Sequence, residues 1–371
     1  MHTEKKVQDT NKKKMKNLVD YVVVLEKSKP YIAIIFIQFV FSGLTLLSKA
    51  SIAKGMDSYV FVFYRQAFGT LALAPIAFFF ESKKATPLSY ILLGKIFLVS
   101  LVGVTASLQF YYLAFKYTTA TLAAASVNTV PALTFIMAAI FRMETISIKH
   151  KYGLAKVLGS IISLSGAMVF GFIKGPPLSF IKWNPATKKL NSHLSTGDYV
   201  KGSFIMLAAN TTWALWLVLQ VLLIKQYPSK FSLSALQCFF SFIQSAVLAV
   251  AMQRSSSAWK LGWDLNLVSV AYSGLVATGM SFWVRLYVLE AKGPVFTAMF
   301  TPVQLIITAI FSAILWSEIL YWGSFGGIVL LVLGLYSFLW GKNKEDVKAE
   351  TDRDRQENKE ETRVEVVTTK A

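Results

Sequence analysis

Ten apolar segments follow one another along the chain, and the connectors between them hold most of the Lys and Arg residues. Each segment is close to the ~20 residues that a helix needs to cross the hydrocarbon core of a bilayer. They occupy approximately residues 31–51, 59–80, 93–115, 120–141, 153–174, 202–224, 232–252, 266–289, 294–316 and 323–341. The pattern predicts an all-α integral membrane protein with ten transmembrane helices.

Landmark residues recur in the same order in the two halves of the chain. A glycine precedes a proline by 28 positions in both halves, and a later pair of glycines is seven positions apart in both. The landmarks are Gly103, Pro131, Glu144, Gly159 and Gly166 in the first half and Gly274, Pro302, Glu318, Gly327 and Gly334 in the second. Such repetition predicts a duplicated membrane bundle, the usual plan of a transporter. Because each half has an odd number of spans, we expect the second half to be inverted relative to the first.

The composition divides the chain into five parts. We expect a basic tail over residues 1–30, a first five-helix repeat over 31–174, a linker over 175–201, a second repeat over 202–341 and a charged tail over 342–371. An even number of spans places both tails on one side, and the basic connectors favour the cytosol for that side, although the linker puts four lysines outside. The last tail alternates acids and bases with almost nothing apolar to bury, which predicts disorder.

The overall composition agrees with a membrane protein. Hydrophobic residues make up 54% of the chain and charged residues 16%, where a soluble domain has about 25%. A formal charge of +18 could indicate a nucleic-acid partner, but the cations lie in tails and connectors, as membrane topology requires. The single cysteine, Cys238, allows neither an intramolecular disulfide nor a cysteine-based metal cluster. We therefore expect lipid and a small solute as partners, with no nucleic acid, metal or cofactor.

Two arginines lie well inside the predicted spans, where an ion costs at least ~2.5 to 3.5 kcal/mol. Arg65 and Arg285 could face a cavity and hold a substrate carboxylate, or they could lie near a membrane face and pair with helix carbonyls or lipid phosphate.

No Asp or Glu lies in the middle of a span, so the carboxylate usual in a proton relay is missing, and passive transport is favoured. Glu144 and Glu318 close the fourth and ninth spans, where they could cap helices, pair with basic connectors or gate the pathway.

Pro131 and Pro302 each fall in the middle of a predicted span. Proline removes a helix hydrogen bond, and the freed carbonyls at that depth must meet protein or cavity water. Asn128 lies near the first proline, and Thr301 and Gln304 lie near the second. Two broken helices flanked by polar groups predict hinges around a central substrate site, although similar kinks and amides also occur in bundles without one.

Further amides and aromatic residues lie at a similar predicted depth on the neighbouring spans. They are Gln38, Gln109, Tyr112, Asn210, Trp213, Gln220 and Trp283. Aromatic walls with a few uncharged amides suit a small polar, zwitterionic or amphipathic solute. Each residue could instead mark a membrane interface or bond across helices. The paired glycines are expected to permit close helix contact rather than to bind a ligand.

Several short motifs together resemble those of the plant nodulin-type EamA transporters, also called the UMAMIT or walls-are-thin-related family. The motifs are Tyr64-Arg65, Ala74-Pro75-Ile76-Ala77, AASVNTVPALTF at 124–135, Arg142-Met143-Glu144, Gln220, Tyr227-Pro228, Gly293-Pro294-Val295-Phe296, Gly334-Leu335-Tyr336 and Trp340-Gly341-Lys342. The resemblance implies ten helices in two inverted five-helix EamA repeats. It also implies a bidirectional facilitator of amino acids or, in some members, auxin, at the plasma membrane or, less favoured, the vacuolar membrane. Arg285 stands where the family leads us to expect a glutamine, which weakens the substrate analogy.

Three function classes follow from these observations. The leading hypothesis is a facilitator that exports neutral amino acids by rocking of two repeats about a midplane site, and its rival is a carrier of auxin or another aromatic acid. A membrane enzyme is disfavoured because the chain has no Gly-x-Ser-x-Gly elbow and no His-Glu-x-x-His pair, and its three histidines lie outside the spans. A receptor or scaffold would bind a ligand without flux.

Overall fold

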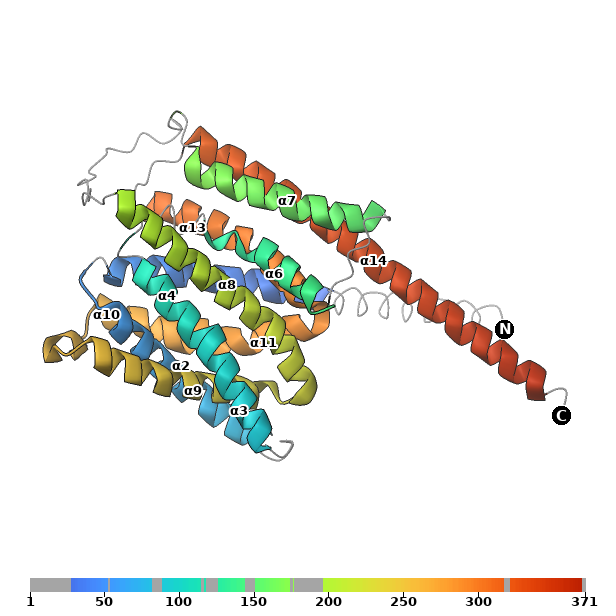
Figure 1. Cartoon of the computed structure of the whole chain (residues 1–371), viewed down its shortest axis with the longest axis horizontal. Coiled ribbons are helices and arrows are strands. Elements are labelled where there is room, and N and C mark those ends of the chain that lie inside the picture. The colour runs from blue at the N-terminus through green and yellow to red at the C-terminus, as the bar shows by residue number, and fades with distance from the viewer. Residues whose placement is uncertain are drawn as a thin grey trace, which may run out of the picture.

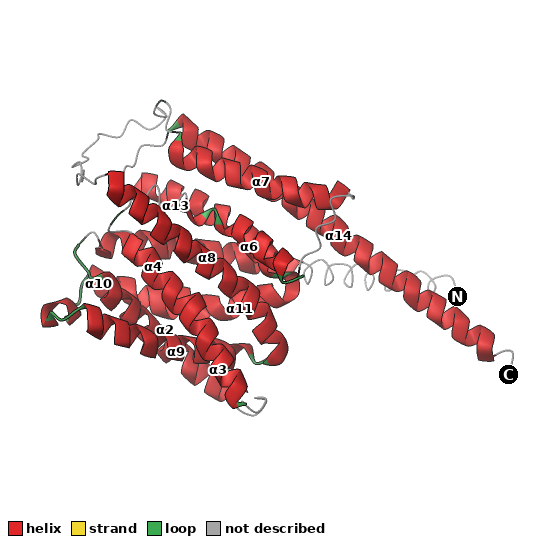
Figure 2. Cartoon of the chain, viewed as in Figure 1, coloured by secondary structure: helices red, strands yellow, loops and turns green. Residues whose placement is uncertain are grey.

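The structure is a computed structural model that describes residues 28–52, 54–81, 89–114, 117, 126–143, 151–173, 176, 196–316 and 321–368. These residues form helices joined by short connections, and Figure 2 shows no strand among them. The all-helical membrane fold predicted from the sequence is therefore confirmed for the described part of the chain.

Helices in the first repeat follow the predicted spans closely. The first helix is Ser28–Ile52 and α2 is Ser58–Glu81. The third span consists of α3 (Tyr90–Val99), the π-helix η1 (Ser100–Thr105) and α4 (Ala106–Ala114). The fourth and fifth are α6 (Val130–Ile140) and α7 (Lys151–Phe172).

The second repeat has the same sequence of elements. It begins with α8 (Thr196–Gln226) and α9 (Lys230–Met252), followed by the short 3₁₀ helix η2 (Ser256–Trp259). The eighth span consists of α10 (Leu265–Ala271), the π-helix η3 (Tyr272–Met280) and α11 (Ser281–Lys292). The last elements are α12 (Pro294–Met299), α13 (Thr301–Trp316) and α14 (Trp322–Thr368).

Nine helical segments of the described chain are long and apolar enough to cross a membrane, one fewer than the sequence predicts. The exception is the fourth span, of which the described residues contain the short apolar helix α6. Residues 120–125 of that predicted span lie outside the described residues, as do Glu144 and Glu318.

The two repeats correspond to each other in their contacts. α2 packs against α9, so the second span is paired with the seventh (Figure 1). α7 packs against α14, so the fifth span is paired with the tenth. η1 contacts α9, while η3 contacts α2. Equivalent helices of the two repeats thus pack against each other. Both repeats carry a π-helix in their third span, around Gly103 in the first and Gly274 in the second.

The glycine pairs lie where α7 and α14 cross. A Cβ on Gly159 would lie 2.7 Å from the Gly334 carbonyl oxygen, and one on Gly166 would lie 3.0 Å from the Gly327 carbonyl oxygen. At these distances a Cβ would clash with the backbone of the facing helix, so glycine is needed at these positions. The predicted role of these glycines in close helix contact is confirmed.

The carboxyl-terminal segment differs from the prediction of a disordered tail over residues 342–371. α14 continues through residue 368 and projects beyond the bundle (Figure 1). The sequence after Gly341 contains no Gly or Pro and is rich in helix-forming Lys, Glu and Arg. Glu345 also lies 2.7 Å from the buried Lys156 on α7 and 3.7 Å from Lys342, so an ion pair holds this part of α14 to α7.

Candidate functional site

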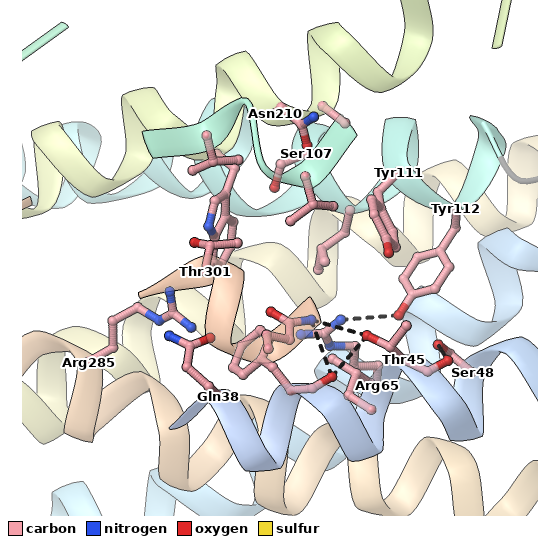
Figure 3. A pocket seen from close by; sticks show the side chains of 18 residues that line it. Gln38, Thr45, Ser48, Arg65, Ser107, Tyr111, Tyr112, Asn210, Arg285 and Thr301 are labelled. Carbon is pink, nitrogen blue, oxygen red and sulfur yellow. Dashed lines mark hydrogen bonds between the residues drawn. The ribbon is translucent and has the colours of Figure 1, made fainter. Parts of the chain in front are cut away.

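A cavity of about 110 Å³ lies between the two repeats, bordered by the first helix, by α2, α4, α8, α11 and α13, and by the start of α6 with Val127 just before it. A water molecule needs roughly 10–15 Å³ of such space, so the cavity has room for a small solute. Eight of the twelve predicted substrate-binding residues line it: Gln38, Arg65, Tyr112, Asn210, Trp213, Arg285, Thr301 and Gln304. Figure 3 shows six of them, Gln38, Arg65, Tyr112, Asn210, Arg285 and Thr301, converging from both repeats.

The other four predicted residues do not line the cavity. Asn128 is buried next to Val127, which does line it, while Gln109 is 7% exposed and its Nε2 has no hydrogen-bond partner among the described residues. Trp283 stacks on Phe231 with a centroid separation of 4.7 Å.

Gln220 forms hydrogen bonds between two helices. Its side-chain amide exchanges two hydrogen bonds of 2.8 Å with the amide of Gln237, which joins α8 to α9. Both side chains are fully buried. The bond across helices, one of the two alternatives left open by the sequence, is the one observed for Gln220.

Ten lining residues were not predicted: Phe41, Leu44, Thr45, Ser48, Ser107, Leu108, Tyr111, Val127, Val130 and Ala209. A signal for several of them was present in the sequence. Gln38, Phe41, Thr45 and Ser48 recur every three or four residues on the first helix, and such spacing places them on one face. A polar stripe on an otherwise apolar helix points inward.

Both prolines start a helix after a break rather than kink a continuous one. Pro131 is the second residue of α6, and Pro302 is the second residue of α13. Proline fits there because the first turn of a helix leaves its N–H groups without intrahelical partners. Their neighbours Val130 and Thr301 line the same cavity, so the two predicted hinge regions meet across it.

Each break is bonded to the first helix of the other repeat. The Asn210 amide on α8 donates to the Ser126 carbonyl at 2.6 Å and to Thr129 Oγ1 at 3.2 Å, just before α6. The Gln304 amide on α13 donates to Thr45 Oγ1 at 3.2 Å on the first helix. The Ser126 carbonyl and the Thr129 hydroxyl beside the first break therefore have protein partners at membrane depth.

Arg65 is held beside the cavity by two side chains. Its Nε donates to Thr278 Oγ1 at 2.9 Å and its Nη1 donates to the Tyr112 hydroxyl at 3.3 Å. Gly69 and Gly274 let α2 and η3 approach closely at this level, because a Cβ on Gly274 would lie 3.0 Å from the Gly69 nitrogen. Arg65 is 2% exposed, so it lies inside the protein and not at a membrane face.

Arg285 occupies a second part of the cavity. Its guanidinium carbon is 4.6 Å from the ring centroid of Phe41 and 5.2 Å from that of Trp213. The side chain is 5% exposed, and its Nε has no hydrogen-bond partner among the described residues. Cation–π contact with the two rings replaces part of the lost hydration.

The cavity is therefore positively charged. Its lining contains two arginines and no Asp, Glu or His, and no carboxylate in the described part of the chain forms a salt bridge with either arginine. The described residues also contain no cluster of His, Cys, Asp and Glu that could hold a metal ion. The remaining lining consists of amides, hydroxyls, aromatic rings and aliphatic side chains, which suits an organic solute with an anionic group.

Comparison with known proteins agrees with this architecture. The EamA-like transporter family matches the chain twice, over residues 28–168 and 200–340. This chain belongs to the EamA-like transporter family. Two matches in one chain show that the EamA unit is duplicated, and they cover both halves that line the cavity.

Relatives within the EamA-like family are similar over most of their length. The chain is 51% identical over 323 residues to the WAT1-related protein At1g43650 of Arabidopsis thaliana, covering 87% of this chain and 94% of that protein. It is 44% identical over 338 residues to the WAT1-related protein At5g64700 of the same plant, covering 89% and 94%. A solved crystal structure shares the fold, with a TM-score of 0.62 at 15% identity, over 84% of this chain and 97% of the other. The protein is thus a multi-pass membrane transporter of the plant WAT1-related type.

Proposed function

We propose that this EamA-family transporter is a bidirectional facilitator of amino acids, which moves its solute by alternating access of the two repeats to the central cavity. The observation that carries the proposal is the junction of both repeats around two buried guanidinium groups. A solute held there touches helices of both halves, so movement of one half against the other can expose it to either side of the membrane.

The lining residues supply complementary groups for an amino acid. Guanidinium groups bind carboxylates through charge-assisted and often bidentate hydrogen bonds, so Arg65 and Arg285 are candidates for the α-carboxylate. Oxygen atoms of Gln38, Thr45 and Ser107 can accept hydrogen bonds from the ammonium group. A cavity lining without Asp, Glu or His favours downhill movement over proton coupling.

A second candidate is transport of an aromatic acid such as auxin. The aromatic rings of Phe41, Tyr111 and Trp213 line the cavity, and none of its lining residues is a carboxylate that could neutralise an ammonium group. A monocarboxylate with an aromatic body would match both features. Binding without flux would instead favour a receptor.

Uptake and efflux of labelled glutamine and labelled indole acetate in oocytes test these proposals. We expect flux of glutamine in both directions, and flux of indole acetate alone would select the second candidate. Ala209→Phe fills the cavity from α8 and should abolish flux of whichever solute is carried. Leu207→Phe adds a ring on the exposed face of the same helix and should not. Flux of neither solute would refute both candidates.

We further propose that the protein acts at the plasma membrane with both tails in the cytosol. The basic connectors support this orientation. Fluorescent tags on either end, combined with protease accessibility in intact protoplasts, test it. Protected tags at the cell boundary are expected, and a signal from the vacuolar membrane or an accessible tag would contradict the proposal.

A further inference from the structure

Arg285 lies between aromatic rings that belong to different repeats. Phe41 is on the first helix of the first repeat, and Trp213 is on α8, the first helix of the second. The guanidinium carbon is within 4.6 and 5.2 Å of the two ring centroids, so one cation is attracted to both halves of the protein. Figure 3 shows Arg285 at the Gln38 end of the cavity.

The ring of Trp213 is held in position by a second aromatic ring. Its ring stacks on Trp216 with a centroid separation of 4.8 Å and an interplanar angle of 23°. Trp216 is fully buried against Gly103, where a Cβ would lie 2.4 Å from Trp216 Cδ1. Trp213 therefore offers a rigid surface to the guanidinium, and movement of Arg285 relative to it breaks a defined contact.

A cluster of buried apolar side chains lies beside this contact, and Phe41 packs against it. No described residue of the first helix before Gln38 lines the cavity. In that direction Ile34 packs with Val288, Phe296 and Phe300, all of them nearly or fully buried. This cluster, here called the inner barrier, joins the first helix to α11 and α12 and must separate if a solute is to leave on the side where the first helix begins.

We propose that the Phe41–Arg285–Trp213 contact is a latch that holds the inner barrier closed and is released when a solute carboxylate binds Arg285. The proposal rests on the proposed function, because it assigns the carboxylate to Arg285 and gives that binding a mechanical result. The guanidinium carbon lies over both rings, and Arg285 Nε has no hydrogen-bond partner among the described residues, so this N–H group can donate to a carboxylate. A carboxylate bound there neutralises the charge that the ring faces attract, so the contact weakens.

Such a latch meets the thermodynamic requirement for coupling. A solute shifts a conformational equilibrium only by its difference in affinity for the two states. Because the open state has no cation–π contact to lose, a carboxylate binds it more favourably than the closed state. A neutral solute of the same shape leaves the charge in place and should not release the latch.

Thiol labelling of the inner barrier tests the latch without any solute. Ile34→Cys in a Cys238→Ala background places one thiol in the barrier, and its rate of reaction with a water-soluble maleimide in purified protein reports opening. Adding Phe41→Leu should raise the rate about fivefold or more, because an apolar residue without a π-face replaces the ring. Phe39→Leu makes the same change on the exposed face of the same helix and should leave the rate unaltered. An unaltered rate in the Phe41→Leu protein overturns the latch, whether or not any solute is carried.

Two solutes of the same shape, one charged and one neutral, test whether the charge of the solute releases the latch. Indole acetate should raise the labelling rate, whereas indole acetamide, which has the same shape without the charge, should not. Arg285→Gln should label fast without a probe and respond equally to both. This second variant keeps the test decisive if Phe41→Leu protein does not fold. Equal effects of acid and amide on the wild-type barrier, or slower labelling with the acid, would overturn release by carboxylate, while wild-type flux of either solute would leave the proposed function standing.

Discussion

Arg65 on α2 donates a 2.9 Å hydrogen bond from Nε to Thr278 Oγ1 on η3, and this bond joins the first repeat to the second beside the cavity. Thr278 lies in a π-helix, whose wider turns change the direction of side chains and are frequent at functional sites. Arg65 thus has a fixed orientation, with Nη1 directed to Tyr112, before any solute arrives.

Replacing this arginine should distinguish anionic from neutral solutes. Arg65→Ala should reduce uptake of indole acetate about tenfold or more, the size expected for loss of a hydrogen bond to a charged group, and should affect indole acetamide much less. Competition uptake in vesicles measures both. Arg254→Ala, at an exposed position after α9, is the matched control. Equal losses for acid and amide would give Arg65 a role in folding alone.

The Gln220–Gln237 pair predicts a change in stability without a change in solute preference. Gln220→Leu leaves the Gln237 amide without its partner in an apolar environment, and the cost should be about 1 to 2 kcal/mol. The double variant Gln220→Leu/Gln237→Leu removes both polar groups and should recover most of the thermal midpoint in detergent. If the double variant is less stable than the single one and solute preference also changes, the pair belongs to the solute pathway.

The crossing of α7 and α14 predicts opposite results for two glycines on one helix. A Cβ on Gly334 would lie 2.5 Å from the Ser163 nitrogen, so Gly334→Ala should lower the stability by about 1 to 3 kcal/mol. Gly326→Ala has nothing within 4 Å of the new atom and should be neutral or stabilising by up to ~1 kcal/mol. Thermal unfolding of the purified variants measures both. Similar midpoints for the two would contradict the close packing of these helices.

Asn210 should be required for flux because it secures the helix break before α6. Asn210→Leu removes the donor to the Ser126 carbonyl, and an unmade bond of this kind costs about 1 to 3 kcal/mol. We expect protein that still reaches the membrane but has lost most of its flux. Thr211→Val, at the next position and away from the cavity lining, should retain flux. Normal flux in Asn210→Leu would show that the break tolerates movement without this bond.

Much of the fold could be predicted from the sequence because membrane spans depend on one local property. Runs of apolar residues mark helices directly, and the repeated Gly–Pro spacing marked the duplication. The tail after Gly341 has alternating charges and almost nothing apolar to bury, while its Glu and Lys residues also favour a continuing helix.

Site residues were harder to predict because burial and cavity lining look alike in a sequence. Gln38 and Gln220 are both amides in apolar helices, yet one lines the cavity and the other pairs with Gln237. The partner lies on another helix, and its distance depends on packing that no local pattern contains. The rings around Arg285 likewise come from two repeats, so their proximity to it appears only in three dimensions.

Flux of labelled glutamine in vesicles reconstituted with the purified protein, with and without an imposed pH difference, tests the central claim most directly. A facilitator whose cavity lining has no Asp, Glu or His should let glutamine equilibrate in both directions to the same internal concentration under both conditions. Accumulation above the external concentration when the pH difference is present, or the absence of any flux above empty vesicles, would contradict the account.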